Sequence, residues 1–501
     1  MSDNPAVMTE RRTPRLEPIN RMQMIMRPID VERLVEEDHP VRAIWEFIGR
    51  LDLSQYHQAI ESVEGKAGRP SWDPQLMICL WIYAYSQGVS SAREIGRLCQ
   101  YDPAYQWLTG MQVINYHSLS DFRVQHKEAL EELFSQVLAV LTSEGLITLQ
   151  RVMHDGTKIK ACASADTFRR EGKIQAYLEL AQAQVRLMEQ AQGEEISPRV
   201  AKARQRAARE RVEKLELAQQ ELERVRAAKS GEKEKKEARV SVTDPEARIM
   251  KEGDGGFGSN YNVQISTDAN AGIIVGVGVS QSASDYGELA PAVERVQEST
   301  EHRPEQVVVD GGFVSRENIL KMDEMGVDLI APIPDGKNQS AGQMDRRGVA
   351  AEYRPESFIY DPASDTFTCP AGKVLKYESK ENCPGRTNYR YRAHVRDCQA
   401  CPFRDKCCPT ATTKGRTIVR SVDHPLVTAF IDKMGTEEAK EIYRDRGAVA
   451  EFPNAWIKEK IGLRQFHVRG LAKAGIEALW ACLTYNLQQW IRLSWRPALA
   501  S

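Results

Sequence analysis

The stretch Ile147-Thr148-Leu149-Gln150-Arg151-Val152-Met153-His154-Asp155-Gly156 decides the fold, because helical sequence gives way here to a strand pattern that ends on a carboxylate. A second stretch, Gln306-Val307-Val308-Val309-Asp310-Gly311-Gly312, has the same order of apolar strand, aspartate and glycine. Glycine beside each aspartate lets backbone and ligand approach closely. We therefore expect Asp155 and Asp310 at the ends of two neighbouring strands.

The residues around these two stretches predict a mixed β-sheet covered by helices, so the fold class is mixed α+β and α/β. Apolar alternation and turn residues define the elements. In chain order they are a hairpin of strands at 262–266 and 273–279, a helix at 288–296, the strand at 306–309, a helix from 315 and a strand at 329–331.

Residues 1–145 predict an all-α domain. Asp38-His39-Pro40 and Asp73-Pro74 are helix starts, and apolar residues follow each at helical spacing. Short helices with tight turns resemble helix-turn-helix packing, which would make this a DNA-binding domain. Most small helical bundles have the same pattern without binding DNA, so both interpretations stay open at this point.

Two segments interrupt the sheet pattern, which is confined to residues 146–168 and 251–334. Residues 169–250 are dominated by Ala, Glu, Lys, Arg and Gln at near-heptad spacing, and Ser197-Pro198 breaks the run, which predicts an antiparallel helical hairpin. Residues 335–424 are rich in Gly, Pro and Cys and predict a Cys-rich β insertion. Helical sequence returns over residues 425–501.

Composition excludes several classes of protein. The chain has 501 residues, 42% of them hydrophobic, and its 68 Lys+Arg and 70 Asp+Glu give a net charge of -2, so DNA binding would depend on local patches. No apolar run approaches the roughly 20 residues of a spanning helix, and the first twenty residues carry no secretory pattern. We expect a multidomain cytoplasmic protein that does not enter a membrane.

Asp155 and Asp310 could hold a divalent metal for phosphoryl transfer, because paired metals activate the attacking oxygen and stabilise the leaving one. A third carboxylate on a later helix would complete such a site, and Glu451 is the candidate. Pro453 places Glu451 in the first turn of a helix or just before it. The alternative is that both aspartates cap turns.

The segment from Arg444 to Arg469 is locally basic, with six Lys and Arg residues against three acidic ones. Phosphate contacts are therefore expected here, although a solvated ion-pair helix would have the same composition. Trp456 would either stack on a displaced base or lie in the core. The candidate DNA contacts are Tyr443, Arg446, Lys458, Lys460, Arg464 and Arg469.

Six of the ten cysteines fall between Cys369 and Cys408. Cys398-x2-Cys401 has zinc-knuckle spacing, and Cys369 with Cys407 or Cys408 would complete four thiolates around a structural Zn²⁺. Free thiols are the alternative, since the second pair is not another Cys-x2-Cys.

Over nearly its whole length the chain resembles DDE transposases of bacterial insertion sequences, most of all the insertion-sequence-1182 family, which is related to the insertion-sequence-4 group. The resemblance rests on seven stretches. They are Gly68-Arg69-Pro70, His117-Ser118-Leu119-Ser120-Asp121-Phe122-Arg123, His154-Asp155-Gly156-Thr157-Lys158, Asp244-Pro245-Glu246-Ala247-Arg248, Tyr261-Asn262-Val263-Gln264, Val308-Val309-Asp310-Gly311-Gly312 and residues 443–470.

The resemblance implies an RNase H-like catalytic core in which Asp155, Asp310 and Glu451 form the catalytic triad and hold two Mg²⁺ or Mn²⁺ ions. It also implies that Tyr443, Arg446, Glu451 and Lys458 are the family's Tyr-Arg-Glu-Lys signature. One feature departs from the insertion-sequence-4 group: four residues, not three, separate Arg446 from Glu451.

The implied function is transposition of a bacterial insertion sequence. The N-terminal domain would bind the terminal inverted repeats, and the triad would hydrolyse the element ends and join their 3′ hydroxyls to target DNA. Related enzymes act as dimers or larger assemblies on DNA. The alternatives are a transposase-derived DNA-binding protein without activity and a Mg²⁺-dependent nuclease that cuts without joining.

Overall fold

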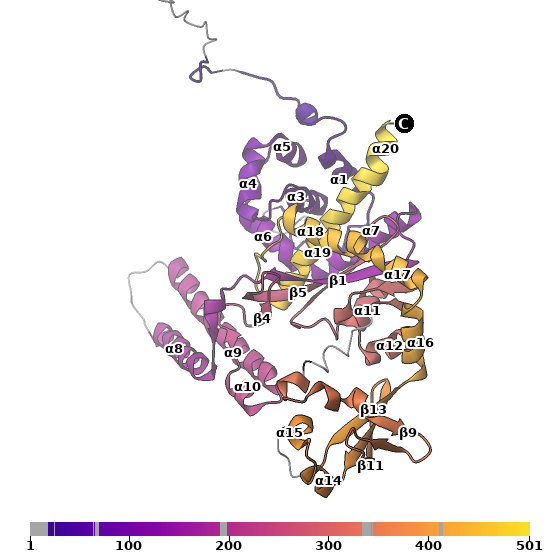
Figure 1. Cartoon of the computed structure of the whole chain (residues 1–501). Coiled ribbons are helices and arrows are strands. Elements are labelled where there is room, and N and C mark those ends of the chain that lie inside the picture. The colour runs from indigo at the N-terminus through magenta and orange to yellow at the C-terminus, as the bar shows by residue number, and fades with distance from the viewer. Residues whose placement is uncertain are drawn as a thin grey trace, which may run out of the picture.

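The computed structural model describes residues 19–24, 26–63, 65, 70–190, 198–332, 342, 344–409 and 414–500. Gly68 and Arg69 of the first resembling stretch, and Ser197 at the predicted helix break, lie outside this part of the chain. Figure 1 shows N-terminal and C-terminal helices together at one end, a sheet in the middle, a helical arm to one side and a small β module at the other end.

A six-stranded mixed sheet forms the centre of the protein, in the order β4-β5-β1-β7-β8 with β6 also paired to β5. β1 pairs antiparallel with β5 and parallel with β7, and β7 pairs parallel with β8. The predicted hairpin is confirmed as the antiparallel pair β5 and β6. The strands are β1 (Arg151–Lys160), β4 (Arg248–Lys251), β5 (Phe257–Asp268), β6 (Ile274–Ser280), β7 (Gln306–Val308) and β8 (Asp328–Ile330).

The expectation that Asp155 ends a strand is wrong. β1 begins only at Arg151, because Leu149 has a φ of 55° and the carboxylate of Asp268 binds the N–H groups of Thr148 and Leu149. β1 then continues to Lys160, because β5 is 12 residues long and pairs with it as far as Asn260. Asp155 therefore lies in the middle of β1.

The N-terminal helices and the long C-terminal helix α19 (Leu471–Trp490) share one hydrophobic core with the sheet. This main core includes Ile78 and Trp81 of the N-terminal helices, Val263 of β5 and Trp480 of α19. The N-terminal helices are η1 (Val31–Leu34), α1 (Pro40–Ile48), α2 (Ser54–Gln58), α3 (Pro74–Ser86), α4 (Ala92–Tyr101), α5 (Pro103–Thr109), α6 (Tyr116–Gln125) and α7 (Lys127–Ser143).

A second core covers the β7 side of the sheet, with Val308, Phe313, Phe430 and Ala450 among its buried residues. The predicted helix from Ser315 is confirmed, since the Ser315 hydroxyl accepts from the Asn318 N–H. The helices around this core are α11 (Leu289–Thr300), α12 (Arg316–Glu324), α16 (Pro425–Met434) and α17 (Glu437–Arg444). The next helix, α18 (Phe452–Glu459), packs against the main core through Ile457, and α20 (Arg496–Ala500) ends the described chain.

The helical arm consists of α8 (Glu171–Gln190) and α9 (Pro198–Ala227), which pack along each other and project from the sheet in Figure 1. Leu178, Ala181 and Leu215 form a buried cluster between these helices. The arm is completed by α10 (Glu232–Lys236) and by the two-stranded pair of β2 (Phe168–Arg169) and β3 (Val240–Ser241).

The Cys-rich segment forms a separate five-stranded antiparallel sheet in the order β13-β12-β11-β10-β9. Its strands are β9 (Ile359–Asp361), β10 (Thr366–Thr368), β11 (Val374–Cys383), β12 (Arg386–Ala393) and β13 (Thr417–Asp423), with the short helices α14 (Val395–Gln399) and α15 (Arg404–Cys407) beside it. We call this unit the β9–β13 module. Across the described residues no helix is both long and apolar enough to span a bilayer.

Candidate active site

Asp155 in β1 lies at the level of Asp310, which follows the end of the neighbouring strand β7 by two residues. The parallel register of β1 and β7 pairs Met153 with Val308, so the residues two positions further on are Asp155 and Asp310. Burial raises the pKa of Asp155 to about 6, and the charge of Asp310 adds to this effect while Arg446 opposes it. The two carboxylates therefore lie close enough to repel each other.

Asp310 also caps a turn. Its Oδ1 accepts from the Gly312 N–H at 2.7 Å, at the start of the 3-10 helix Gly311–Phe313. The turn-capping interpretation thus holds for Asp310. Asp155 is different, because its carboxylate oxygens accept from side chains of the C-terminal segment.

Arg446 links Glu451 to this site, because its guanidinium contacts both Glu451 and Asp155. The Arg446 guanidinium lies 2.8 Å from Asp155 Oδ1 by Nη2 and 3.4 Å from Glu451 Oε1 by Nη1. Its own side chain is only 8% exposed, whereas that of Glu451 is 65% exposed. The three acidic residues of the predicted triad are therefore brought to one place, with a guanidinium between Asp155 and Glu451.

The spacing that departs from the insertion-sequence-4 group is accommodated by a change of helix type. Residues Gly447–Glu451 form a π-helical segment that runs directly into α18. A π-helix closes its hydrogen bonds between residues five apart, and such segments often occur at functional sites. Arg446 and Glu451 are five apart, so the extra residue still leaves both side chains on the same face.

α18 presents two more polar side chains to β1. Asn454 Nδ2 donates to Asp155 Oδ2 at 2.9 Å, and the Lys458 ammonium donates to the Thr157 hydroxyl. Residues four apart on a helix share a face, as do residues two apart on a strand. Asn454 and Lys458 therefore meet Asp155 and Thr157 as two successive pairs between α18 and β1. Burial lowers the pKa of Lys458. Sequence reasoning missed Asn454 and Thr157, although Asn454 lies four residues before Lys458 and so on the same helical face.

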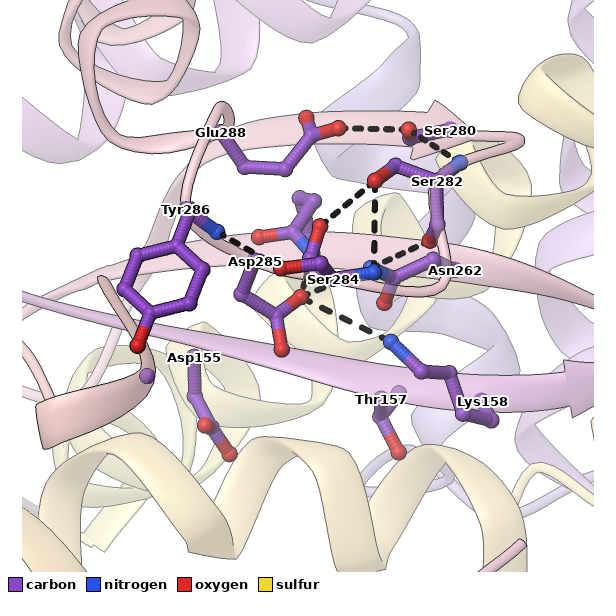
Figure 2. Close-up of polar contacts among 12 residues, drawn as sticks. Asp155, Thr157, Lys158, Asn262, Ser280, Ser282, Ser284, Asp285, Tyr286 and Glu288 are labelled. Atoms are coloured by element: carbon purple, nitrogen blue, oxygen red, sulfur yellow. Dashed lines mark hydrogen bonds and ion pairs between the residues drawn. The ribbon is translucent and has the colours of Figure 1, made fainter. Parts of the chain in front are cut away.

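The other face of β1 carries a second polar cluster, which Figure 2 shows around Asp285. Asp285 Oδ1 accepts from Asn262 Nδ2 at 2.7 Å and from Gln264 Nε2 at 2.9 Å, and the Lys158 ammonium lies 3.6 Å away. Gly156 makes this approach possible, because a Cβ there would lie 2.7 Å from Asp285 Oδ1. Sequence reasoning missed Asp285. The polar residues between β6 and α11 were the feature that could have indicated a functional residue there.

His154 supports the Asp285 cluster from within the sheet, through its hydrogen bond to Gln264. Its Nδ1 lies 2.9 Å from the Ser266 hydroxyl and its Nε2 lies 2.8 Å from Gln264 Oε1. Burial lowers the pKa of His154 to about 3, so the ring is neutral near pH 7. The neutral histidine holds the Gln264 side chain by its oxygen, so that the amide nitrogen of Gln264 can donate to Asp285.

The predicted DNA contacts separate into two groups. Lys460, Arg464 and Arg469 are exposed, as a phosphate-binding surface requires. Arg446 and Lys458 face the carboxylate site, and Tyr443 packs beside the second core. Trp456 is half-buried beside the main core and donates from Nε1 to Gln488 Oε1 at 2.8 Å.

The donor chemistry of the site suits a hard divalent cation, since carboxylate oxygens are the preferred ligands of Mg²⁺ and Mn²⁺. Within the described ranges, however, no three His, Cys, Asp or Glu side chains are already arranged as a metal-binding set. The reason in this site is Arg446, which occupies the space between Asp155 and Glu451.

Two models of known protein families match this chain, and both describe transposase domains. A family model described as a transposase DDE domain matches residues 368–491, and one described as a transposase domain (DUF772) matches residues 29–125. The first match contains Glu451 and Lys458, and Asp155 and Asp310 lie outside it. Comparison with curated proteins gives no match.

The two family matches support a transposase, an enzyme that cuts DNA and transfers the cut ends. More particularly, they support a DDE transposase of insertion sequences, a class that acts on DNA and typically uses divalent metal ions.

Proposed function

We propose that this chain moves a bacterial insertion sequence, and more narrowly one of the insertion-sequence-1182 family. It binds the terminal inverted repeats, hydrolyses a strand at each end and joins the freed 3′ hydroxyl to target DNA. The observation that carries the proposal is the convergence of Asp155, Asp310 and Glu451, from β1, β7 and the segment before α18, around Arg446.

The arrangement of the strands supports an RNase H-like core for this activity. In the path β6-β5-β1-β7-β8, the first three strands are antiparallel and the last three are parallel. This order places the middle of β1 beside the end of β7, so that residues from both can act on one phosphate. The helical arm and the β9–β13 module are then insertions into this core.

Asp155, Asp310 and Glu451 would hold two Mg²⁺ or Mn²⁺ ions. Bound there, the ions would supply activation of the attacking oxygen and stabilisation of the leaving one. Asn454 holds Asp155 Oδ2 in place, and the buried position of Asp155 keeps bulk water away from its carboxylate. Arg446 neutralises Asp155 and Glu451, a role that bound cations would share.

The exposed cations Lys460, Arg464 and Arg469 would contact the phosphates of the element end. The backbone N–H of Lys160, the last residue of β1, donates to the Arg464 carbonyl, which fixes this basic loop to the end of the catalytic strand. The N-terminal helices pack on α19 directly after the loop, which favours their contact with the same DNA. We propose a homodimer or larger assembly on paired ends, acting in the bacterial cytoplasm.

The test is transposition of a selectable marker flanked by the DNA that borders this gene, in cells that supply the native protein, Asp310→Ala or Asp323→Ala. Asp323 is an exposed carboxylate on α12 and serves as the matched control. We expect joined products from the native and Asp323→Ala proteins and none from Asp310→Ala. Cleavage without joining would indicate a nuclease, and binding of the flanks without cleavage would indicate a DNA-binding protein.

A further inference from the structure

Five cysteines of the β9–β13 module line one small cavity of about 30 Å³. All five are free thiols, and they come from three separate pieces of chain. Cys369 follows β10, two come from the turn around α14, and two lie at the end of α15. The five residues are Cys369, Cys398, Cys401, Cys407 and Cys408.

The backbone around these thiols is arranged to stabilise thiolate sulfur. Cys369 Sγ accepts from the Lys373 N–H at 3.3 Å across a tight turn in which Gly372 has a φ of +76°. Cys398 Sγ accepts from the Arg416 N–H at 3.3 Å. Hydrogen bonds to an anionic ligand favour its charged form and orient it, which is the outer-shell arrangement of structural metal sites.

Two guanidinium groups provide the opposite charge beside the cavity. Arg404 and Arg416 are both in its lining, and Arg416 donates from Nη1 to the Cys407 carbonyl and from Nη2 to the Tyr353 carbonyl, each at 3.2 Å. Four thiolates around a divalent cation carry a net charge of about -2. The two arginines would offset that charge.

The module needs such a crosslink because its own core is small. Among the described residues of the module, six buried hydrophobic residues form that core, and Cys369, Cys398 and Cys407 pack against its edge. Small units with few buried residues are commonly stabilised by a metal or by disulfides. Free thiols at the edge of a small core therefore favour a metal.

We propose that Cys369, Cys398, Cys401 and Cys407 bind a structural Zn²⁺ that holds the β9–β13 module together, independently of the catalytic chemistry. A cavity of about 30 Å³ has room for one water-sized ion. Four thiolates are a common zinc ligand set. The sulfurs surround the cavity without yet forming a ligand set, so binding requires rotation of the cysteine side chains about χ1.

Metal analysis of the full-length protein, purified without chelators or metal-affinity resin, tests this proposal. We expect about one zinc per chain in the native protein and almost none in Cys398→Ser. Cys383→Ser is the matched control, because Cys383 belongs to the same module, lies outside the cavity lining and accepts only from Asn388. A native protein that retains no zinc after incubation with it, or equal loss in both variants, would overturn the proposal.

Cobalt substitution of the native protein gives a second readout that does not depend on a folded variant. Four-thiolate tetrahedral Co²⁺ shows strong sulfur-to-metal charge transfer and intense visible bands, and both should disappear on adding Zn²⁺. Absence of these bands, or a disulfide between two of the cavity cysteines in the purified protein, would contradict the site. Cys407→Ser should abolish binding and Cys408→Ser should retain it, and the reverse result would overturn Cys407 as the fourth ligand.

Discussion

Arg446 and Glu451 meet across a π-helical segment, with Arg446 Nη1 3.4 Å from Glu451 Oε1. In an ordinary α-helix residues five apart point in different directions, so this contact depends on the wider turn. The same guanidinium holds Asp155 at 2.8 Å. Arg446 is thus the shared counter-charge of Asp155 and Glu451.

Replacement of Arg446 should therefore destabilise the metal-free protein and increase the effect of added cation. In Arg446→Ala, Asp155 would remain half-enclosed beside Asp310 without a neutralising partner, a loss of about 3 kcal/mol in the free energy of unfolding. Added Mn²⁺ should then raise the melting temperature of the variant more than that of the native protein. Thermal unfolding with and without Mn²⁺ measures both effects.

Arg444→Ala is the control for that experiment, because Arg444 lies on α17 with a side chain that is 67% exposed. We expect little change in its stability or its response to Mn²⁺. If Arg446→Ala unfolds like the native protein at every Mn²⁺ concentration, Arg446 does not neutralise the site.

Several parts of the fold follow from local pattern alone. Alternation and turn residues predict the β5–β6 hairpin, and the helix after Ser315 follows from its capping residue. The neighbourhood of Asp155 and Asp310 was predicted from two similar stretches of apolar strand, aspartate and glycine, although β1 continues beyond Asp155. Each of these features depends on a pattern among residues that are close together in the sequence, so each could be predicted from the sequence.

Other parts depend on contacts between distant segments. The extent of β1 is set by the length of β5, about a hundred residues away, so Asp155 could not be placed in mid-strand from its own neighbours. Asp285 reaches Gly156 from a loop that has no periodic pattern. The π-helical segment before α18 was visible only as an unusual spacing between Arg446 and Glu451.

Gly156 should be intolerant of any side chain. In Gly156→Ala the new Cβ would lie within 3 Å of both Gln264 Nε2 and Asp285 Oδ1, at 2.6 and 2.7 Å. Overpacking of this kind costs about 1–3 kcal/mol and would displace Asp285 from its amide donors. Chemical denaturation should show the loss, together with reduced transposition.

Gly172→Ala is a matched control for that change, because Gly172 lies in α8 and a Cβ there would meet no atom within 4 Å. Alanine favours helix, so this variant should be as stable as the native protein or slightly more stable. Equal stability of the two alanine variants would show that β1 can move away from Asp285.

The Asp244-Pro245-Glu246-Ala247-Arg248 stretch binds the start of α19. Asp244 Oδ1 accepts from the Tyr261 hydroxyl at 2.8 Å and from the Gly470 N–H at 3.1 Å, and Glu246 accepts from the Leu471 N–H at 2.9 Å. Burial raises the pKa of Asp244, although the Tyr261 hydroxyl and the Gly470 N–H lower it in part. Folding therefore favours the protonated form.

Because the pKa of Asp244 is raised in the folded protein, the free energy of unfolding should depend on pH. Since the folded pKa of Asp244 is above the unfolded one, its favourable contribution is complete below about pH 4 and is lost as the pH rises through the folded value. Asp244→Asn keeps an oxygen acceptor and cannot titrate. The free energy of unfolding of the native protein minus that of Asp244→Asn should fall as the pH rises above about 4. A constant or rising difference in urea titrations would refute the assignment.

The exposed basic loop gives a prediction about DNA affinity. Lys460→Ala and Arg469→Ala would each remove one proposed phosphate contact outside the carboxylate site, so binding to the element ends should weaken without a change in sequence preference. Each lost contact should reduce the slope of log affinity against log salt by about 1. Titration of labelled end DNA at several salt concentrations measures both quantities.

Lys321→Ala on α12 removes an equally exposed cation from another helix and should leave affinity and slope unchanged. Lys458→Ala should behave differently again, because Lys458 donates to the Thr157 hydroxyl of β1. We expect it to lower strand cleavage more than binding. If instead Lys458→Ala reduces the salt slope as Lys460→Ala does, Lys458 leaves Thr157 to contact phosphate when DNA is bound.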